Sequence, residues 1–389
     1  KKSLLAGVIV YLIGSIGCVL SFSTEVFMFF RVVSGAGMAF LTVSSMAMVV
    51  SAVKPQNRGK ALGYTVTGVY IATSLSPVIC GLLTFNFGWR AIFYVAIPFL
   101  ILCLALIMIK IPMEWQTYAE DKIDKIGSII WGIGILAFVY GFTNLVNSTG
   151  VFLTVFGLAV IVVFIFYELR QKSPVFNVRL FKNTKFLSSN VAALCSYLAI
   201  MVVTTILNYH FQYVRGWNTQ MTGMMLIIPP ILQAILAPNA GKLSDKYNPQ
   251  VIAAIGMAVA ACGLAILAFL DGNMPLYLVV IAMALEGIGM GVFSSPNMNA
   301  IMSSVPPKDA PTASASQATM RTIGQTMSLG MLTLVFAWIM GDLPMLAKYA
   351  DLIVQGSQII CVICTVLCII GIFSSLFGIR SKDKFNTES

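Results

Sequence analysis

The sequence predicts an all-α integral membrane protein made of two pseudo-symmetric helix bundles with two extra linker helices between them. Hydrophobic residues make up 58% of the 389 residues and charged residues only 10%, whereas soluble domains average about 25% charged residues. Twelve apolar runs are each long enough to cross a bilayer, which takes about 20 residues. A segment near the start of the chain also recurs near its end. A membrane must cover this much apolar surface.

The expected transmembrane helices follow one another with short connections, so the sequence leaves no room for a soluble domain. A segment inside lipid must satisfy its own backbone hydrogen bonds, and each apolar run is therefore predicted to be a helix. The predicted spans are 3–22, 26–52, 61–84, 91–110, 127–146, 151–168, 187–208, 220–240, 250–270, 276–302, 312–340 and 356–379.

The basic residues predict the orientation of these helices. If Lys1 and Lys2 face the cytoplasm, nineteen of the 24 Lys and Arg residues fall on that side. Only Arg90, Arg215 and Lys348 fall outside, and two more lie within helices. Lys and Arg favour cytoplasmic loops, so we expect a multi-pass protein of the cytoplasmic membrane. The net charge of +10 then reflects topology and does not indicate a nucleic-acid partner.

Several function classes are poorly supported. The chain has one histidine, His210, which we interpret as a polar residue at the outer end of its helix, and its eight cysteines all lie inside apolar runs. This composition predicts no disulfide framework, no metal site and no enzyme. A nucleotide-binding loop of the form GxxxxGK[ST] is also absent from the sequence, so we expect no cofactor and a proton gradient as the energy source.

The internal repeat relates residues 34–63 to residues 286–315 at a constant offset of 252. The matched pairs are Gly35/Gly287, Gly37/Gly289, Met38/Met290, Met46/Met298, Ser51/Ser303, Val53/Val305, Pro55/Pro307 and Ala61/Ala313. Both copies run from outside to a cytoplasmic loop, and parallel repeats of this kind are typical of transporters, whose site lies between the two halves.

The repeat also predicts the domain organisation. Residues 187–389 form a six-helix bundle, residues 111–186 hold two linker helices and cytoplasmic loops, and residues 1–110 supply only four helices of the other bundle. We therefore expect two further helices ahead of Lys1, and fourteen in the complete protein.

Four motifs carry a family resemblance. They are Arg31-Val-Val-Ser34-Gly35-Ala-Gly37; a spaced set of small residues in 61–84; Gly88-Trp89-Arg90 with Phe93 and Pro98; and the loop from Gly241 to Asn248. Together they resemble the major facilitator superfamily, in its fourteen-helix drug:proton antiporter branch (the EmrB/QacA type). Ser34 stands where the family has Gln, and small residues replace three glycines of the antiporter motif.

The resemblance implies roles for these residues. The antiporter motif would let helix 61–84 approach a neighbour closely and line the central interface, either as packing or as part of a gate; its positions are Gly63, Ala72, Ser76, Pro77, Cys80 and Gly81. Gly241, Asp245 and Lys246 would form a cytoplasmic gate loop, or else an ordinary capped turn. Arg31 would influence the proton affinity of a nearby acid, or else extend to the outer interface.

Glu286 is a site candidate from this sequence alone, since the family does not regularly place an acid there. It lies ten residues into its helix, near the midplane at about 1.5 Å per residue. It is the only carboxylate that we place deep in the membrane. Such a group can take up a proton or pair with a cationic substrate, as proton-for-cation exchange requires. The alternative is a fixed ion pair with Arg321, which also lies near half depth.

Other polar and aromatic residues at depth are candidates for a substrate cavity, although many such residues serve only as hydrogen bonds between helices. They are Tyr64, Tyr70, Asn190, Tyr197, Asn208, Gln233, Asn297, Gln317 and Gln325.

These observations lead us to expect proton-coupled export of amphipathic, cationic small molecules by alternating access of two bundles. The expected partners are a small-molecule substrate and membrane lipid, with a periplasmic adaptor if the cell has two membranes, and we expect a monomer. A dedicated metabolite, lipid or siderophore exporter of the same fold is one alternative. A non-transporting scaffold is another, disfavoured because a passive bundle has little reason to bury Glu286, Arg31 and Arg321.

Overall fold

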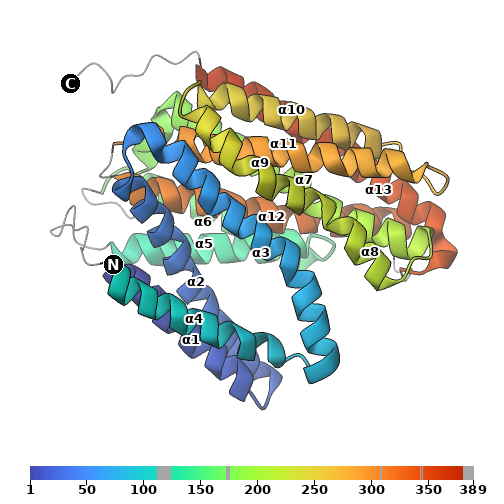
Figure 1. The fold of residues 1–389 in the computed structure, drawn as a ribbon, viewed down its shortest axis with the longest axis horizontal. Coiled ribbons are helices and arrows are strands. Elements are labelled where there is room, and N and C mark those ends of the chain that lie inside the picture. The colour runs from blue at the N-terminus through green and yellow to red at the C-terminus, as the bar shows by residue number, and fades with distance from the viewer. Residues whose placement is uncertain (112–123, 172–175, 307–308, 342, 344, 380–389) are drawn as a thin grey trace. The chain divides into compact units, whose positions relative to one another are not determined.

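The computed structural model describes residues 1–111, 124–171, 176–306, 309–341, 343 and 345–379, and these residues are overwhelmingly helical (Figure 1). Within this described part, eleven helical segments are long and apolar enough to cross a membrane. The twelfth expected span corresponds to α3 (Arg58–Phe87), a helix of 30 residues. The all-α membrane fold predicted from the sequence is confirmed.

The described chain divides into two compact units. The first comprises Lys1–Lys54 and Ala72–Ala119, of which residues 112–119 fall outside the described part. It contains α1 (Lys2–Leu20), α2 (Thr24–Ala52), α4 (Ala91–Lys110) and the part of α3 from Ala72 onward. Helix α1 packs most extensively on α2 and also contacts α4.

The α1–α2 contact is close because small residues face each other. A Cβ atom added to Gly37 of α2 would lie 2.4 Å from the backbone nitrogen of Tyr11 on α1, and one added to Gly14 would lie 2.4 Å from the Ser34 hydroxyl. Small residues allow backbones to approach in lipid, where van der Waals packing replaces the hydrophobic effect between helices. Gly37 belongs to the Arg31–Gly37 motif, so this part of the motif serves packing.

The second unit comprises Pro55–Ile71 and the chain from Glu120, described from Asp124. Besides the first half of α3 it contains α5 (Lys125–Thr143), α6 (Ser148–Glu168), α7 (Thr184–Tyr209), α8 (Thr219–Leu226), α9 (Ile228–Ser244), α10 (Pro249–Leu267), α11 (Leu276–Ser303), α12 (Ala310–Met340) and α13 (Ala350–Ile379). Short 3₁₀ turns lie at Pro55–Asn57, Val178–Lys182 and Ala347–Tyr349, and a π turn at His210–Val214 continues α7.

The core of the second unit lies among α7, α10, α11 and α13. Helix α11 packs on α10 and α9, and α13 packs on α7 and α10. Val202, Leu264, Met283, Ile360 and Cys364 are fully or almost fully buried there. Cys361, Cys364 and Cys368 share this apolar face, as free cysteines often do in cores. Helices α5 and α6 pack on each other, and α5 contacts α12.

The repeat found in the sequence coincides with helix boundaries. Helix α2 begins at Thr24 and α11 at Leu276, which is 252 residues later. Helix α3 begins at Arg58 and α12 at Ala310, again 252 residues later. Equal spacing of two consecutive helices agrees with the offset found from residue identities, so the repeat reflects duplicated elements.

The structure differs from the expected elements at two places. The span expected at 220–240 is two helices, α8 and α9, which meet at Ile227. Pro229 and Pro230 cannot donate backbone hydrogen bonds to the preceding turn, and this ends α8. The tight loop expected from Gly241 is also wrong in part, because α9 continues to Ser244 and only Asp245 begins the connection.

Candidate functional site

A group of polar side chains in the interior of the second unit forms the charged centre, defined here as Glu286, Arg321, Tyr197, Gln317, Tyr70 and Ser294. These residues come from four helices: α11 supplies Glu286 and Ser294, α12 supplies Gln317 and Arg321, α7 supplies Tyr197 and α3 supplies Tyr70. Tyr70 precedes Ala72, the residue at which α3 passes to the first unit, so the whole group belongs to one unit.

Glu286 is buried at the centre of α11, with 5% of its surface exposed. Helix α10 approaches it closely, because a Cβ atom on Gly263 would lie 3.0 Å from the Glu286 backbone nitrogen. No hydrogen bond or ion pair joins its carboxylate to a residue in the described part of the chain. A buried carboxylate without such a partner is costly when ionised, so it favours holding a proton or a cationic ligand.

Arg321 does not form the fixed ion pair with Glu286 that the sequence left open. Its guanidinium carbon lies 6.0 Å from the centre of the Tyr197 ring, within the range of cation–π attraction. The Tyr197 hydroxyl in turn accepts a hydrogen bond of 3.1 Å from the Gln317 side chain. Arg321 is thus held over an aromatic face, and Glu286 remains open to another partner.

Tyr70 connects α3 to the charged centre. Its hydroxyl lies 2.5 Å from the Ser294 hydroxyl, and Ser294 also donates to the Met290 carbonyl at 2.8 Å. Ser294 is two helical turns from Glu286 on α11. The Tyr70–Ser294 contact therefore joins α3 to α11 at this level of the helix.

A second feature is the α3–α9 contact, defined here as Gly59, Gly63 and Thr67 of α3 with Ala234, Ala237 and Gly241 of α9. A Cβ atom on Gly59 would lie 2.3 Å from the Gly241 carbonyl oxygen, and one on Gly63 would lie 2.8 Å from the Ala237 carbonyl oxygen. Thr67 donates a hydrogen bond of 3.2 Å to the Ala234 carbonyl. The backbones touch along this stripe, so any side chain larger than hydrogen at Gly59 would separate them.

Asp245 caps the N-terminus of α3 at one end of the α3–α9 contact. Its Oδ1 accepts a hydrogen bond of 2.6 Å from the Gly59 backbone N–H, and its Oδ2 accepts one of 2.9 Å from that of Lys60. Both donors lie in the first turn of α3, where unpaired N–H groups and the helix dipole favour an anion. The helix that Asp245 caps is therefore α3, whose Gly59 lies 186 residues earlier in the chain.

Neighbouring polar residues form further hydrogen bonds at the Asp245 end of the α3–α9 contact. Ser295 of α11 donates to the Gly59 carbonyl at 3.2 Å. The Asn299 side chain donates to the Ser244 hydroxyl at 3.0 Å. Lys246, which the sequence placed in the same gate, is exposed and contributes only its backbone N–H, to Leu243.

Other candidates have structural partners or lie apart from the charged centre. Asn190 of α7 accepts a hydrogen bond of 2.7 Å from Ser316 of α12, so it ties two helices together. Asn208 accepts one of 2.7 Å from Gln212, one turn along the chain. Gln233 and Asn297 are buried, Gln325 is half-buried, and Tyr64 is 57% exposed. His210 is also buried and accepts a hydrogen bond of 2.9 Å from Arg215, so it is not an exposed interfacial residue.

The remaining motif residues belong to the first unit. Arg31 is exposed and makes no hydrogen bond within the described part of the chain; its charge acts on the Cys18 thiol of α1. Ala72 and Ser76 are exposed on α3, and the Ser76 hydroxyl lies 3.7 Å from the Cys80 sulfur. For Pro77 and Gly81 only the helical backbone is described, and their surroundings lie outside the described part.

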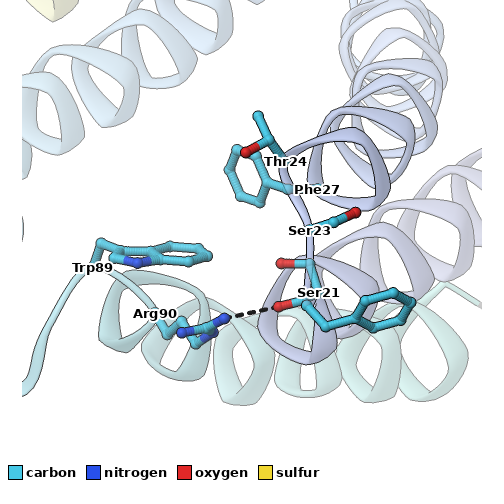
Figure 2. Close-up of a pocket in the computed structure, with 7 residues that line it drawn as sticks. Ser21, Ser23, Thr24, Phe27, Trp89 and Arg90 are labelled. Atoms are coloured by element: carbon cyan, nitrogen blue, oxygen red, sulfur yellow. Dashed lines mark hydrogen bonds between the residues drawn. The ribbon is translucent and has the colours of Figure 1, made fainter.

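A pocket of about 570 Å³ lies at the connection between α1 and α2, lined by Ser21, Phe22, Ser23, Thr24, Phe27, Trp89 and Arg90. Figure 2 shows Arg90 reaching the connection between these helices, where it donates to the Ser21 carbonyl at 2.7 Å. It also donates to the Val19 carbonyl at 3.2 Å and lies 4.4 Å from the Trp89 ring centre. Arg90 therefore braces this connection.

Comparison with known proteins identifies the family. Residues 1–329 match the sequence profile of the Major Facilitator Superfamily. The chain belongs to this superfamily. As a member, it is a multi-pass membrane transporter of small molecules, and its class is not an enzymatic one.

Curated relatives in the superfamily carry different substrate names. The chain is 25% identical over 97% of its length to the riboflavin transporter RibZ of Clostridioides difficile, of which it covers 83%. It is 27% identical over 88% of its length to the multidrug resistance protein Stp of Mycobacterium tuberculosis, of which it covers 65%.

Solved structures in the superfamily share the fold. The human organic anion transporter MFSD10 superposes with a TM-score of 0.71 at 11% identity, covering 96% of this chain and 76% of that one. The proton:xylose symporter XylE superposes with a TM-score of 0.63 at 14% identity, covering 97% and 78% respectively. At these identities the likeness concerns the fold alone.

Proposed function

We propose that this transporter exports amphipathic, cationic small molecules across the cytoplasmic membrane in exchange for protons, by alternating access. The observation that carries the proposal is Glu286, a buried carboxylate without a hydrogen-bond or ion-pair partner among the described residues. A carboxylate of that kind can hold either a proton or a cation, but not both at once. Because the two compete for Glu286, proton entry is coupled to export of the cationic substrate. The motifs of the fourteen-helix antiporter branch and the name of the Stp relative support the same function.

The charged centre gives a physical basis for choosing among cations. Tyr70 and Tyr197 provide aromatic faces that attract lipophilic cations. Arg321, which lies over Tyr197, repels small cations that could not also pack on the rings. We propose that Glu286 attracts the substrate's positive charge while the tyrosines bind its apolar part. The protein would work as a monomer, with a periplasmic adaptor where the cell has two membranes.

Inverted membrane vesicles provide the test. With the interior made acidic, vesicles carrying the protein should accumulate a fluorescent lipophilic cation, and collapse of the proton gradient should release it. Glu286→Gln should reduce the accumulation to the level of vesicles without the protein, since an amide takes up no proton. Glu25→Gln, an exposed acid at the start of α2, is the matched control and should behave as the wild type.

A different result would redirect the proposal. Gradient-driven accumulation that survives Glu286→Gln would keep the antiporter and remove Glu286 from the coupling step. Absence of cation accumulation in the wild type would contradict the multidrug proposal.

A dedicated metabolite exporter is the second candidate, favoured by the similarity to RibZ over almost the whole chain. Arg321 above the Tyr197 ring also suits a planar ring system with hydrogen-bond acceptors. Riboflavin uptake measured in the same vesicles distinguishes the two candidates: uptake of riboflavin without uptake of the lipophilic cation would select this one.

A further inference from the structure

We infer that Arg321, Tyr197 and Gln317 form a binding subsite for a carboxylate of the substrate, called here the anion subsite. The substrate that binds best therefore carries a carboxylate in addition to its positive charge. This inference rests on the proposed function, because it names the chemical class of molecule that the transporter exports.

Arg321 has no anionic partner in the protein. No hydrogen bond or ion pair joins its guanidinium group to a residue of the described chain. The helices that pack most on α12 are α7, α13, α5 and α11. Neither α12 itself nor α7 or α5 contains Asp or Glu, and Asp351 of α13 lies in the first turn of that helix. An unpaired cation inside a membrane helix is costly, so Arg321 favours an anion brought by a ligand.

Arg321 lies on the inward face of α12. Gln317, Arg321, Gly324 and Ser328 follow one another at intervals of four, three and four residues, so they share one side of the helix. Gln317, Gly324 and Ser328 are all buried, whereas Arg321 is half-buried. Because the residues before and after it are covered by protein, the open part of Arg321 is reached from inside the bundle and not from lipid.

Contacts between α7 and α12 hold the anion subsite from both sides. Before Arg321 along α12, Ser316 donates a hydrogen bond of 2.7 Å to Asn190. After it, a Cβ atom on Gly324 would lie 2.9 Å from the Tyr197 Cβ atom, so the two helices touch there. The Tyr197 side chain is thereby fixed opposite Arg321, and a ligand meets groups that are already in place.

The three side chains of the anion subsite offer hydrogen-bond donors. The guanidinium of Arg321 lies 6.0 Å from the centre of the Tyr197 ring, and attraction to the ring face leaves its five N–H groups free to bond. The Tyr197 hydroxyl accepts a bond of 3.1 Å from Gln317, so its own proton is available to a ligand. A carboxylate fits this set, since it accepts two parallel bonds from arginine and a further one from a hydroxyl.

A matched pair of dyes tests the anion subsite by binding alone. Rhodamine B is a lipophilic cation that carries one carboxylate, and its ethyl ester has the same cationic ring system without the carboxylate. The affinity of each dye would be measured by fluorescence anisotropy with the full chain in detergent at neutral pH, where the carboxylate is ionised. The signal of empty micelles is subtracted.

The parent protein should bind rhodamine B more tightly than the ester. Arg321→Gln should weaken binding of rhodamine B by about tenfold to hundredfold, the effect of losing hydrogen bonds between charged groups. Binding of the ester should be unchanged or tighter in this variant, which also shows that the variant is folded. Arg321→Lys keeps the charge but loses the paired geometry, so it should weaken rhodamine B binding less than Arg321→Gln.

Two further variants complete the test. Tyr197→Phe keeps the ring and removes the hydroxyl, so it should weaken binding of rhodamine B by about threefold to tenfold and leave the ester unaffected. Arg179→Gln is the matched control, because Arg179 belongs to the same unit, is exposed and donates only to the Leu169 carbonyl. It should bind both dyes as the parent does.

The outcomes separate this inference from the proposed function. If the parent binds both dyes equally, or if Arg321→Gln weakens both by the same factor, the inference is overturned; gradient-driven accumulation of the ester in inverted vesicles would still uphold the proposed function. A preference for rhodamine B that Arg321→Gln abolishes, without gradient-driven accumulation of either dye, would support the anion subsite and contradict proton-coupled export. Binding of neither dye to the parent would overturn both.

Discussion

At the scale of single residues, the interior of this transporter separates charges that could have neutralised each other. Arg321 lies on Tyr197, while Glu286 stays buried without a partner in the described chain. A fixed ion pair between them would have stabilised the bundle and would have bound neither proton nor ligand. The separation keeps the carboxylate chemically available, at a cost in stability that the surrounding core must offset.

Asp245 gives the first prediction at this scale. Asp245→Asn keeps one acceptor oxygen but removes the negative charge at the start of α3, so one of the two bonds to Gly59 and Lys60 is lost. We expect the free energy of unfolding to fall by about 1–2 kcal/mol, as for charged hydrogen bonds at a helix N-terminus. Thermal unfolding in detergent measures the change.

Lys246→Gln is the control for Asp245→Asn, because the Lys246 side chain is exposed. It should leave the unfolding temperature unchanged. Asp245→Asn raises the net charge of the segment by one and Lys246→Gln lowers it by one, so changes of opposite sign in the two variants would indicate that this charge matters and that the cap on α3 does not.

Part of the site could be predicted from single residues. Glu286, Arg321, Tyr70, Tyr197 and Gln317 stand out as polar groups at depth in apolar runs, and the structure brings them together. Ser294 and Ser295 gave no such signal, because serine is common in membrane helices and often bonds to its own backbone. Their role depends on what α3 places opposite them.

At the scale of elements, the central feature is how closely α3 and α9 pack. The antiporter motif begins at Gly63 in the sequence, but the contact begins one turn earlier, at Gly59. Glycines or other small residues four positions apart are a signal for close helix packing. Because Gly59 and Gly63 have this spacing, the predicted motif could have been extended by one turn to Gly59. The partner helix could not be predicted, because Thr67 and its partner Ala234 on α9 are 167 residues apart and spacing within α3 carries no information about that helix.

Two glycines of α3 provide a matched pair for testing this contact. Gly59→Ala places a methyl group 2.3 Å from the Gly241 carbonyl and should lower the free energy of unfolding by about 1–3 kcal/mol, a typical cost of overpacking. Gly68→Ala meets nothing within 4 Å and should be neutral or stabilise by up to about 1 kcal/mol. Thermal unfolding of both variants measures the difference.

The comparison is informative because both changes add the same methyl group to the same helix. A destabilised Gly68→Ala would mean that helical glycine itself is required. A stable Gly59→Ala would mean that α3 does not rest on α9 in the folded protein.

At the scale of the whole molecule, the fold could be predicted almost completely. Composition, twelve apolar runs and the offset of 252 residues defined the all-α architecture, and α2, α3, α11 and α12 begin where the repeat requires. The interruption between α8 and α9 was missed because hydropathy does not register a local break. Side-chain partners such as Asp245 with α3 depend on helix packing, which no linear pattern specifies.

The predicted topology can be tested by the sidedness of single introduced cysteines. Lys246 lies in the connection after α9 and Lys348 precedes α13, and the three spans α10, α11 and α12 separate them. Lys246→Cys should react with an impermeant maleimide in inverted vesicles and Lys348→Cys only in intact cells, since an odd number of crossings changes the side. Reaction of both on one side would mean that one of the three helices does not cross. In that case the preference of Lys and Arg for cytoplasmic loops would not explain why the basic residues are in excess on the predicted side of Lys246.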